Sequence, residues 1–217
     1  MIWWPEEIPT LTSGSVTLRP VQPTDAEAIY RGAQDPEVPK FTTLPANYTL
    51  ENAINFSKDR APARHANRSE LIFAIEFAEL PLESQGSSKS DLTKGSTADT
   101  TNGSMADLRK ATNSIELAGV ISLHSLDFAN HRAEIGYWMV KEARNKGICT
   151  AAVELITEYG LITMGFRRID ALVDDRNEAS KRLLLKAGYE FEGILKKYVT
   201  RPDGNQIDMA LFASTAN

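Results

Sequence analysis

The stretch that decides the fold is 133–152, which reads AEIGYWMVKEARNKGICTAA. Its first part, 135–140, is a run of aromatic and β-branched residues that is typical of a strand. Its last part predicts an amphipathic helix, because apolar residues recur at three- and four-residue spacing, at Ile148, Ala152, Leu155, Ile156 and Tyr159. Between them lies a basic, glycine-containing turn. The stretch therefore predicts a strand, a turn and a helix in that order.

The turn has the properties of an anion site. The first N–H groups of a helix have no partner within the helix and lie at the positive end of its dipole. Arg144 and Lys146 add two cations beside them. Such a turn suits a phosphate or pyrophosphate, although an ordinary solvated helix start has the same composition. The two standard nucleotide loops, G-x-x-x-x-G-K-[ST] and G-x-G-x-x-G, are absent here.

Three blocks in a fixed order resemble the GNAT superfamily of N-acetyltransferases. The turn, Arg144-x-x-Gly147-x-Cys149, resembles its acetyl-CoA pyrophosphate loop, Q/R-x-x-G-x-G/A, with a cysteine at the last small position. The AEIGYW block at 133–138 resembles the central strand of the subfamily that acetylates the N-termini of ribosomal proteins. The NEAS block at 177–180, with KAGY at 186–189, resembles its next helix and turn. The resemblance spans roughly residues 16–213, apart from one insertion.

The resemblance implies an α/β fold with a mixed, mostly antiparallel sheet of about seven strands and about four helices. In that fold the central strands separate in a V-shaped splay, where the pantetheine arm of acetyl-CoA binds. It implies acetyl-CoA as the acyl-donor cosubstrate and direct attack by an amine in a ternary complex. The residues that it assigns to the cofactor are Trp138, Met139, Val140, Arg144, Asn145, Lys146, Gly147, Ile148, Cys149, Thr150 and Asn177.

Glu134 is the candidate general base. Side chains alternate along a strand, so Glu134 and Trp138 face one side, and Tyr137 and Met139 face the other. A carboxylate at the end of an apolar strand has its pKa raised by desolvation and accepts a proton directly or through water. The alternative is a structural ion pair with a neighbouring arginine, Arg132 or Arg168.

Ser180 is the candidate proton donor to the leaving thiolate. The tyrosine that the superfamily often uses as general acid falls near Leu184 here, and some members of the subfamily use a serine at the Ser180 position. The alternative is a helix residue bonded to its cap, which Asn177 provides. His124 and His131 are weaker candidates for orienting or replacing the base.

Length, charge and cysteine content indicate which classes of protein this chain can belong to. With 217 residues, 42% hydrophobic and 24% charged, the chain is expected to form one globular domain, 1–217. A net charge of −5 argues against a non-specific nucleic-acid binder. The single cysteine, Cys149, excludes an intrachain disulfide and a zinc–cysteine cluster, so no metal is expected. As a nucleophile it would imply a covalent acetyl-enzyme.

Nothing in the sequence indicates a membrane or a secretory route. There is no apolar run of about 18 residues, and the start, MIWWPEEIPTL, has no basic or apolar signal region. We therefore expect a cytoplasmic protein, either a monomer or a homodimer. Trp3 and Trp4 are expected to dock on the core, or else to contact substrate or a second subunit.

In the N-terminal half, a strand is expected at 16–19, followed by a helix that opens with the capping-box pattern Thr24-Asp-Ala-Glu27. A second helix is expected at 49–60 with Ala53 and Ile54 inward. After Asp35-Pro36 the chain either forms a plain loop or, as the resemblance implies, borders the acceptor site with Lys40, Phe41 and Tyr48.

Two antiparallel strands are expected at 71–77 and 116–123. They are separated by a Ser/Thr-rich flexible insertion, 84–114, which is either a tolerated loop or a lid. Towards the C-terminus we expect a helix stop at Gly165, a strand at 169–173 and a helix from Asn177 to Gly188. Two final strands follow within 191–212, with a turn at 202–205.

The function predicted from these features is acetyl transfer to a primary amine, either a protein or peptide N-terminus or a small molecule. The other class considered is a non-catalytic acyl-CoA-binding module. That module would need the loop residues Arg144 and Gly147 but neither Glu134 nor Ser180.

Overall fold

The computed structural model describes residues 2–78, 114–201 and 203–216. Its strands form one eight-stranded sheet in the order β1-β2-β3-β4-β5-β6-β8-β7. The strands are β1 (Leu11–Ser13), β2 (Val16–Pro20), β3 (Leu71–Ala78), β4 (Ser114–Asp127), β5 (Arg132–Met139), β6 (Arg168–Asp174), β7 (Glu190–Thr200) and β8 (Gln206–Thr215). All neighbouring pairs are antiparallel except β5 and β6. The predicted mixed sheet is confirmed, and the extra strand is β1, which is too short to show an alternating pattern.

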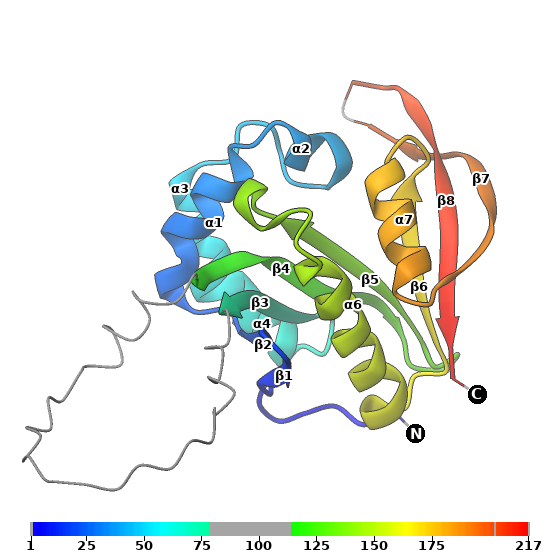
Figure 1. Cartoon of the computed structure of the whole chain (residues 1–217), viewed down its shortest axis with the longest axis horizontal. Coiled ribbons are helices and arrows are strands. Elements are labelled where there is room, and N and C mark those ends of the chain that lie inside the picture. Colours follow the sequence, from blue (N-terminus) through cyan, green and yellow to red (C-terminus); the bar gives the residue numbers. More distant parts are fainter. Residues whose placement is uncertain (1, 79–113, 202, 217) are drawn as a thin grey trace, which may run out of the picture.

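The helices lie on both faces of this sheet (Figure 1). They are α1 (Ala26–Ala33), α2 (Glu37–Phe41), α3 (Leu50–Asn55), α4 (Ala61–Ala66), α6 (Ile148–Glu158) and α7 (Glu178–Lys186). The helix expected at 49–60 continues through a π-helical turn, Phe56–Arg60, into α4. The further helix is α2, which forms after Asp35-Pro36 and so replaces the plain loop. None of the described helices is both long enough and apolar enough to cross a bilayer.

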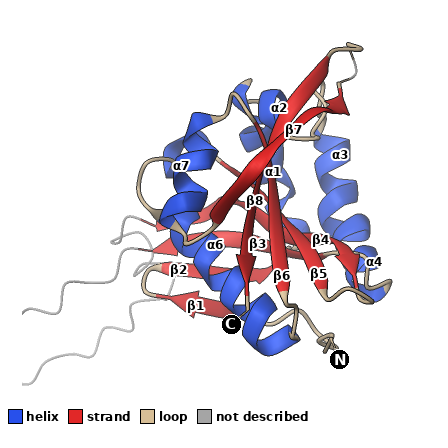
Figure 2. Cartoon of the chain, turned by 90° about the vertical axis from the view of Figure 1, so that its right-hand side faces the viewer, coloured by secondary structure: helices blue, strands red, loops and turns tan. Residues whose placement is uncertain are grey.

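Two apolar cores lie on opposite faces of the sheet, so its central strands, β3 and β4, are buried on both faces. Alternate residues of β3 enter different cores: Phe73 packs towards α6 and α7, whereas Ile72 packs towards α1, α3 and α4. This explains why β3 reads as a continuous apolar run. Seen at right angles, the helices cover the sheet in this way on either side (Figure 2).

Three local expectations in the N-terminal half are wrong. Thr24 does not cap α1, because a 3-10 turn precedes it, and Asp25 accepts the N–H of Gln22 at 2.7 Å instead. Ile54 is 46% exposed rather than inward, since only Ala53 of that pair faces the core. Tyr48 is buried against α1 and α3, so it belongs to the core and not to an exposed acceptor wall.

The N-terminal segment docks on the core as expected for Trp4, whose ring stacks on His65 at 5.4 Å between centroids. Trp3 is half exposed, but its N–H donates to the carbonyl of Met164 at 2.8 Å. Most of the insertion expected at 84–114 lies outside the described residues. Its last residue, Ser114, begins β4 and is the antiparallel partner of Ala78.

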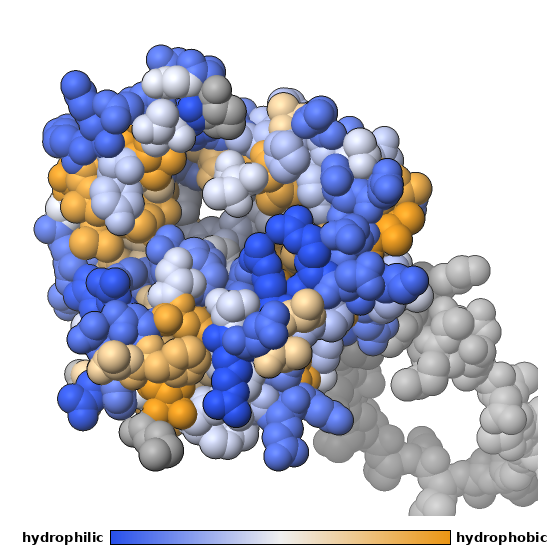
Figure 3. Space-filling model, turned by 180° about the vertical axis from the view of Figure 1, so that it is seen from behind, coloured by the Kyte–Doolittle hydropathy of each residue, from blue (hydrophilic) through white to orange (hydrophobic). Residues whose placement is uncertain are grey.

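The predicted splay is present between β5 and β6. These parallel strands pair only over Arg132–Glu134 and Arg168–Asp170. Beyond that point β5 runs on to Met139, paired only with β4, while β6 runs on to Asp174, paired only with β8. The space-filling view from behind shows a hollow in this face of the molecule (Figure 3). The separation leaves one edge of β5 without a strand partner.

Candidate active site

Along the open edge of β5, only every second residue directs its backbone N–H and C=O groups towards the gap between β5 and β6. The N–H of Val140 donates to Ala118 at 2.9 Å, so Val140 and Trp138 direct their backbone groups towards β4. By the same alternation, Tyr137 and Met139 direct theirs towards the gap. The residues predicted to lie along the pantetheine arm are Trp138, Met139 and Val140. Of these only Met139 faces the gap, and it offers its backbone N–H there, since its carbonyl accepts from Arg144. Tyr137, which is not among them, also directs its backbone groups to the gap.

The basic turn forms as predicted and presents a row of backbone donors. Gly147 has φ +76° and Asn145 has φ +60°, both left-handed, and α6 starts directly afterwards. Ala151 is the first residue of α6 whose N–H bonds back, to Gly147 at 3.1 Å. The N–H groups of 145–150 have no hydrogen-bond partner among the described residues. Such a row, with the exposed Lys146 beside it, fits the pyrophosphate of acetyl-CoA.

Arg144 points away from this row. Its Nη2 and Nε donate to the carbonyl of Met139, at 2.9 and 3.3 Å. Its Nη2 also lies 2.8 Å from Oδ2 of Asp35, in the connection between α1 and α2. The guanidinium is thus held between the end of β5 and the helical side of the molecule.

Glu134 lies at the point where the splay begins. It pairs with His124 of β4 on one side and Asp170 of β6 on the other. Burial, and then the negative charge of Asp170, raise the pKa of Glu134. Its Oε1 lies 4.0 Å from Nε2 of His124, whose own pKa is lowered by burial and by the positive charge of Arg64. The carboxyl group therefore faces a neutral imidazole at neutral pH.

The alternative role for Glu134, an ion pair with a neighbouring arginine, is not what the described residues form. Arg132 and Arg168 both pair with Asp170, at 3.6 and 2.5 Å, and Arg168 also pairs with Glu192 at 2.5 Å. Both arginines named as alternative partners of Glu134 are thus paired with Asp170. The carboxylate of Glu134 remains available to accept a proton.

We expect the raised pKa of Glu134 to set the acid limb of the pH–rate profile. A base works only when deprotonated, so kcat rises as the pH rises through this pKa, which lies above the usual carboxyl value of 4.5. Stopped assays across pH 4.5–9 are the measurement, roughly ten points at saturating substrate. In Glu134→Gln the residual rate should lose this limb, whereas an unchanged limb would assign it to another group.

Ser180 lies on the opposite face of β5, at the start of α7. Its N–H donates to Oδ1 of Asn177 at 3.1 Å, which confirms Asn177 as the helix cap. Its Oγ lies 2.7 Å from the hydroxyl of Tyr137. Burial raises the pKa of Tyr137, so the phenol keeps its proton. The sequence placed Tyr137 on this face of the strand but gave no sign that its hydroxyl meets Ser180, because the two are far apart along the chain.

Cys149, considered as a nucleophile, and His131, considered as a base, are less suited to these roles than Glu134 and Ser180. Burial raises the pKa of Cys149 to about 12, which keeps the thiol protonated and disfavours a covalent acetyl-enzyme. His131 lies in the turn before β5 with φ +54°, and its carbonyl accepts the N–H of Arg167 at 2.8 Å. Of the two histidines considered, His124 is the one that faces Glu134.

The family follows from a direct match. A model of the acetyltransferase (GNAT) domain matches residues 15–190. The chain belongs to the GNAT acetyltransferases. As a GNAT enzyme it uses acetyl-CoA as cosubstrate, which the row of free N–H groups before α6 is suited to hold.

Relatives of this GNAT chain include proteins with and without an assigned acceptor. An uncharacterized N-acetyltransferase of Bacillus subtilis, YoaA, is 29% identical over 191 residues, 88% of each chain. The ribosomal-protein-serine acetyltransferase of Escherichia coli is 32% identical over 82 residues, 38% of this chain and 46% of that one. A ribosomal L7/L12 alpha-N-protein acetyltransferase, RimL, solved with coenzyme A, has the same fold, with a TM-score of 0.71, 16% identity and coverage of 95% and 98%.

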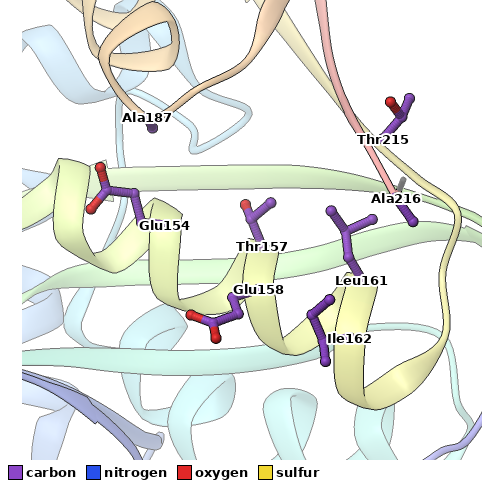
Figure 4. A pocket seen from close by; sticks show the side chains of 8 residues that line it. All are labelled: Glu154, Thr157, Glu158, Leu161, Ile162, Ala187, Thr215 and Ala216. Carbon is purple, nitrogen blue, oxygen red and sulfur yellow. The ribbon is translucent and has the colours of Figure 1, made fainter.

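A surface groove of about 400 Å³ lies apart from these groups (Figure 4). It is formed by Glu154 and Glu158 on the outer side of α6 and by Leu161 in the π-helical turn Tyr159–Met164 that follows α6. Ala187 and Thr215, at the end of β8, complete it. None of the residues predicted for catalysis or cofactor binding lines it.

Proposed function

We propose that this GNAT enzyme transfers the acetyl group of acetyl-CoA to the α-amine of a protein or peptide N-terminus, by direct attack in a ternary complex. The observation that carries the proposal is the arrangement around the splay. Glu134 lies on one face of β5, the hydroxyls of Ser180 and Tyr137 lie on the other, and the unpaired edge of β5 lies between them. A proton acceptor and a proton donor thus flank the same gap.

The bound cosubstrate supplies an activated acetyl thioester. In the proposed step the carboxylate of Glu134 accepts a proton from the attacking amine as its nitrogen bonds to the acetyl carbon. The carbon–sulfur bond breaks, and Oγ of Ser180 gives its proton to the departing sulfur. Tyr137 keeps its own proton and stays hydrogen-bonded to Oγ of Ser180 at 2.7 Å, while Ser180 recovers a proton from solvent and Glu134 releases to solvent the proton that it took from the amine. Edge N–H groups of β5, on Tyr137 and Met139, are suited to polarise the thioester carbonyl.

The cofactor assignments extend to the turn before α6. We propose that the N–H groups of 145–150, on Asn145, Lys146, Gly147, Ile148, Cys149 and Thr150, hold the pyrophosphate, with the ammonium of Lys146 as a further contact. Asn177, at the cap of α7, lies three residues before Ser180 and is proposed to contact the arm.

The peptide acceptor is supported by the relatives named for ribosomal-protein acetylation. The test is mass spectrometry of a pooled reaction containing the protein, acetyl-CoA, free-N-terminus peptides and small amines. Acetylated peptides that require active protein support the proposal. Acetylated small amines alone would replace it with a small-molecule enzyme. Coenzyme A binding with no product in any pool would favour the non-catalytic module.

Ser180→Ala is expected to lower kcat by about 10²-fold, and Tyr137→Phe by about tenfold, because the second variant keeps the hydroxyl that gives the proton. The KM for acetyl-CoA should stay within about threefold in both, since neither side chain belongs to the pyrophosphate loop. Steady-state kinetics with the acceptor found above is the measurement. Tyr198→Phe, at a phenol that is 56% exposed on β7, is the matched control. A larger loss in Tyr137→Phe than in Ser180→Ala would make Tyr137, and not Ser180, the group that protonates the departing sulfur.

A further inference from the structure

His124 and Glu134 lie opposite each other on β4 and β5, where the splay begins. Nε2 of His124 lies 4.0 Å from Oε1 of Glu134, and Nδ1 lies 3.0 Å from the hydroxyl of Ser125. Ser125 has φ +49° and stands where the β4–β5 register shifts, and an irregularity of this kind re-aims a side chain. With the hydroxyl donating to Nδ1, the ring proton is on Nε2 and faces the carboxylate. The imidazole therefore has one nitrogen for Ser125 and the other for Glu134.

A missing side chain makes room for this imidazole. Gly136 lies two residues after Glu134, on the same face of β5. A Cβ atom at Gly136 would lie 2.8 Å from Nε2 and 3.2 Å from Cδ2 of His124. The ring thus leans over the glycine, and any side chain at this position would displace it from its place beside Glu134. Glycine weakens a strand, so its presence here fits a position where another group approaches closely.

A buried ion pair lies next to His124 on this face of the sheet. Glu70, which precedes β3, is only 9% exposed, and its Oε2 pairs with Arg64 of α4. Its Oε1 accepts a hydrogen bond from Oγ of Ser122 at 2.7 Å. Ser122 is two residues before His124 on β4, so both side chains leave the same face of the strand. Both oxygens of Glu70 are thus engaged, and the pair anchors the guanidinium of Arg64 on the side of the imidazole.

Charged groups reach His124 from the elements packed around it. Burial, and then the positive charge of Arg64, lower the pKa of His124 from its ordinary value of 6.5. The carboxylate of Glu134 acts in the opposite sense, because a negative charge favours the imidazolium. Glu70 is committed to Arg64 and Ser122, and Asp170 of β6 acts on Glu134 from the other side.

We infer that His124 is a positioning residue for Glu134: its uncharged imidazole directs Nε2–H at the carboxylate, and Arg64, anchored by Glu70 and Ser122, keeps the ring uncharged. An uncharged donor orients the carboxylate and leaves it basic, whereas an imidazolium would form an ion pair and weaken it as a base. The 4.0 Å spacing exceeds a hydrogen bond, and contacts of this kind tighten in complexes with substrate. The inference rests on the proposed function for the role of Glu134 as the base.

The first test is a proton NMR titration of the three histidines over about pH 5–9, in the protein without cosubstrate. His124→Gln assigns the signal of His124, which should titrate below pH 6.5 in the wild type. Arg64→Gln removes a positive charge and should move the midpoint to higher pH, whereas Glu134→Gln removes a negative one and should move it to lower pH. Arg60→Gln, at an exposed arginine in the turn before α4, is the matched control and should leave the midpoint unchanged.

The second test is the pH–rate profile of variants at the ring. His124→Leu should lower kcat by about tenfold at neutral pH and move the acid limb to higher pH, because the carboxylate loses a donor that favours its charged form. His124→Gln has an uncharged N–H donor and should recover most of this loss. Gly136→Ala changes no charge but displaces the ring, so it should resemble His124→Leu. The KM for acetyl-CoA should stay within about threefold in all three, since none of them alters the turn before α6.

Arg64→Gln separates an effect through His124 from a structural fault. It should lower kcat by about threefold near pH 6.5 and have little effect near pH 8.5, where the ring is uncharged again. Damage from an unpaired Glu70 would lower kcat equally at both pH values. In the double variant Arg64→Gln/His124→Gln the pH-dependent loss should vanish, because no ring remains to be charged.

Three results would overturn the inference. They are a His124 midpoint that neither Arg64→Gln nor Glu134→Gln moves, a His124→Leu enzyme with the wild-type kcat and acid limb, and a pH-dependent loss in Arg64→Gln that persists without His124. A wild type that acetylates no acceptor is a different result, because it would contradict the proposed function. The two midpoint shifts would then still establish the contacts of His124 with Arg64 and Glu134, since they need no turnover.

Discussion

Glu134→Gln is expected to lower kcat by about 10²–10³-fold while the KM for acetyl-CoA stays within about threefold. The amide keeps the size of the side chain but has no carboxylate oxygen that can take a proton from the attacking amine. The effect should be confined to the chemical step, because Glu134 lies at the start of the splay, away from the pyrophosphate turn. Steady-state kinetics at saturating acetyl-CoA, together with a coenzyme A binding isotherm, is the measurement.

Glu154→Gln is the matched control, since Glu154 is exposed on the outer side of α6 and lines the separate groove. It should retain the wild-type kcat. If Glu134→Gln instead raised the acceptor KM and left kcat intact, Glu134 would be a binding group for the ammonium of the acceptor. The base would then have to be sought at His124, whose imidazole faces the same carboxylate.

Asp174→Ala is expected to reduce the free energy of unfolding by about 1–3 kcal/mol, the usual cost of leaving a partly buried polar group without its hydrogen-bond partner. The side chain of Asp174 is only 3% exposed at the end of β6, and it pairs with Arg176 and Arg201, each at 2.7 Å. Arg201 is mostly buried, so it would lose its counter-ion without gaining full hydration. Urea unfolding followed by circular dichroism measures the change, with Asp59→Ala as an exposed control.

The same carboxylate should make stability depend on acid. Hydrogen bonds from Arg176, and then from Arg201, lower the pKa of Asp174 from 3.8 to about 2. A carboxylate with a lowered folded pKa contributes stability that is complete above the unfolded value and is lost as the pH falls towards the folded one. The wild type should therefore lose stability between about pH 4 and pH 2 more steeply than Asp174→Ala. Parallel curves would show that Asp174 is not a source of this acid dependence.

Local pattern was enough to predict the elements that hold the site. The strand–turn–helix at 133–152, the stop at Gly165 and the cap at Asn177 each depend on neighbouring residues, and each is found as expected. The splay was implied by the family resemblance, and the short β5–β6 pairing bears it out. Local pattern failed where burial depends on distant segments, as at Ile54, which the helical prediction for 49–60 placed inward but which is exposed.

The contacts that give the site its chemistry could not be predicted in the same way. Tyr137 of β5 meets Ser180 of α7, and Arg144, which follows β5, meets Asp35, which lies between α1 and α2. Neither pair has a spacing rule, since both join segments that only the tertiary fold brings together. A sequence shows which face of a strand a tyrosine occupies, but the partner of its hydroxyl is a property of the whole sheet.

The pairing of Ala78 with Ser114 has a practical consequence for protein engineering. Opposite residues of an antiparallel pair have Cα atoms roughly 5 Å apart, so the chain leaves the sheet and re-enters it at one place. A segment spliced in there has its two ends fixed side by side, as a hairpin turn would. The position therefore suits either replacement by a two-residue Asn-Gly turn or the grafting of a reporter domain whose termini are adjacent, with the register of β3 and β4 preserved.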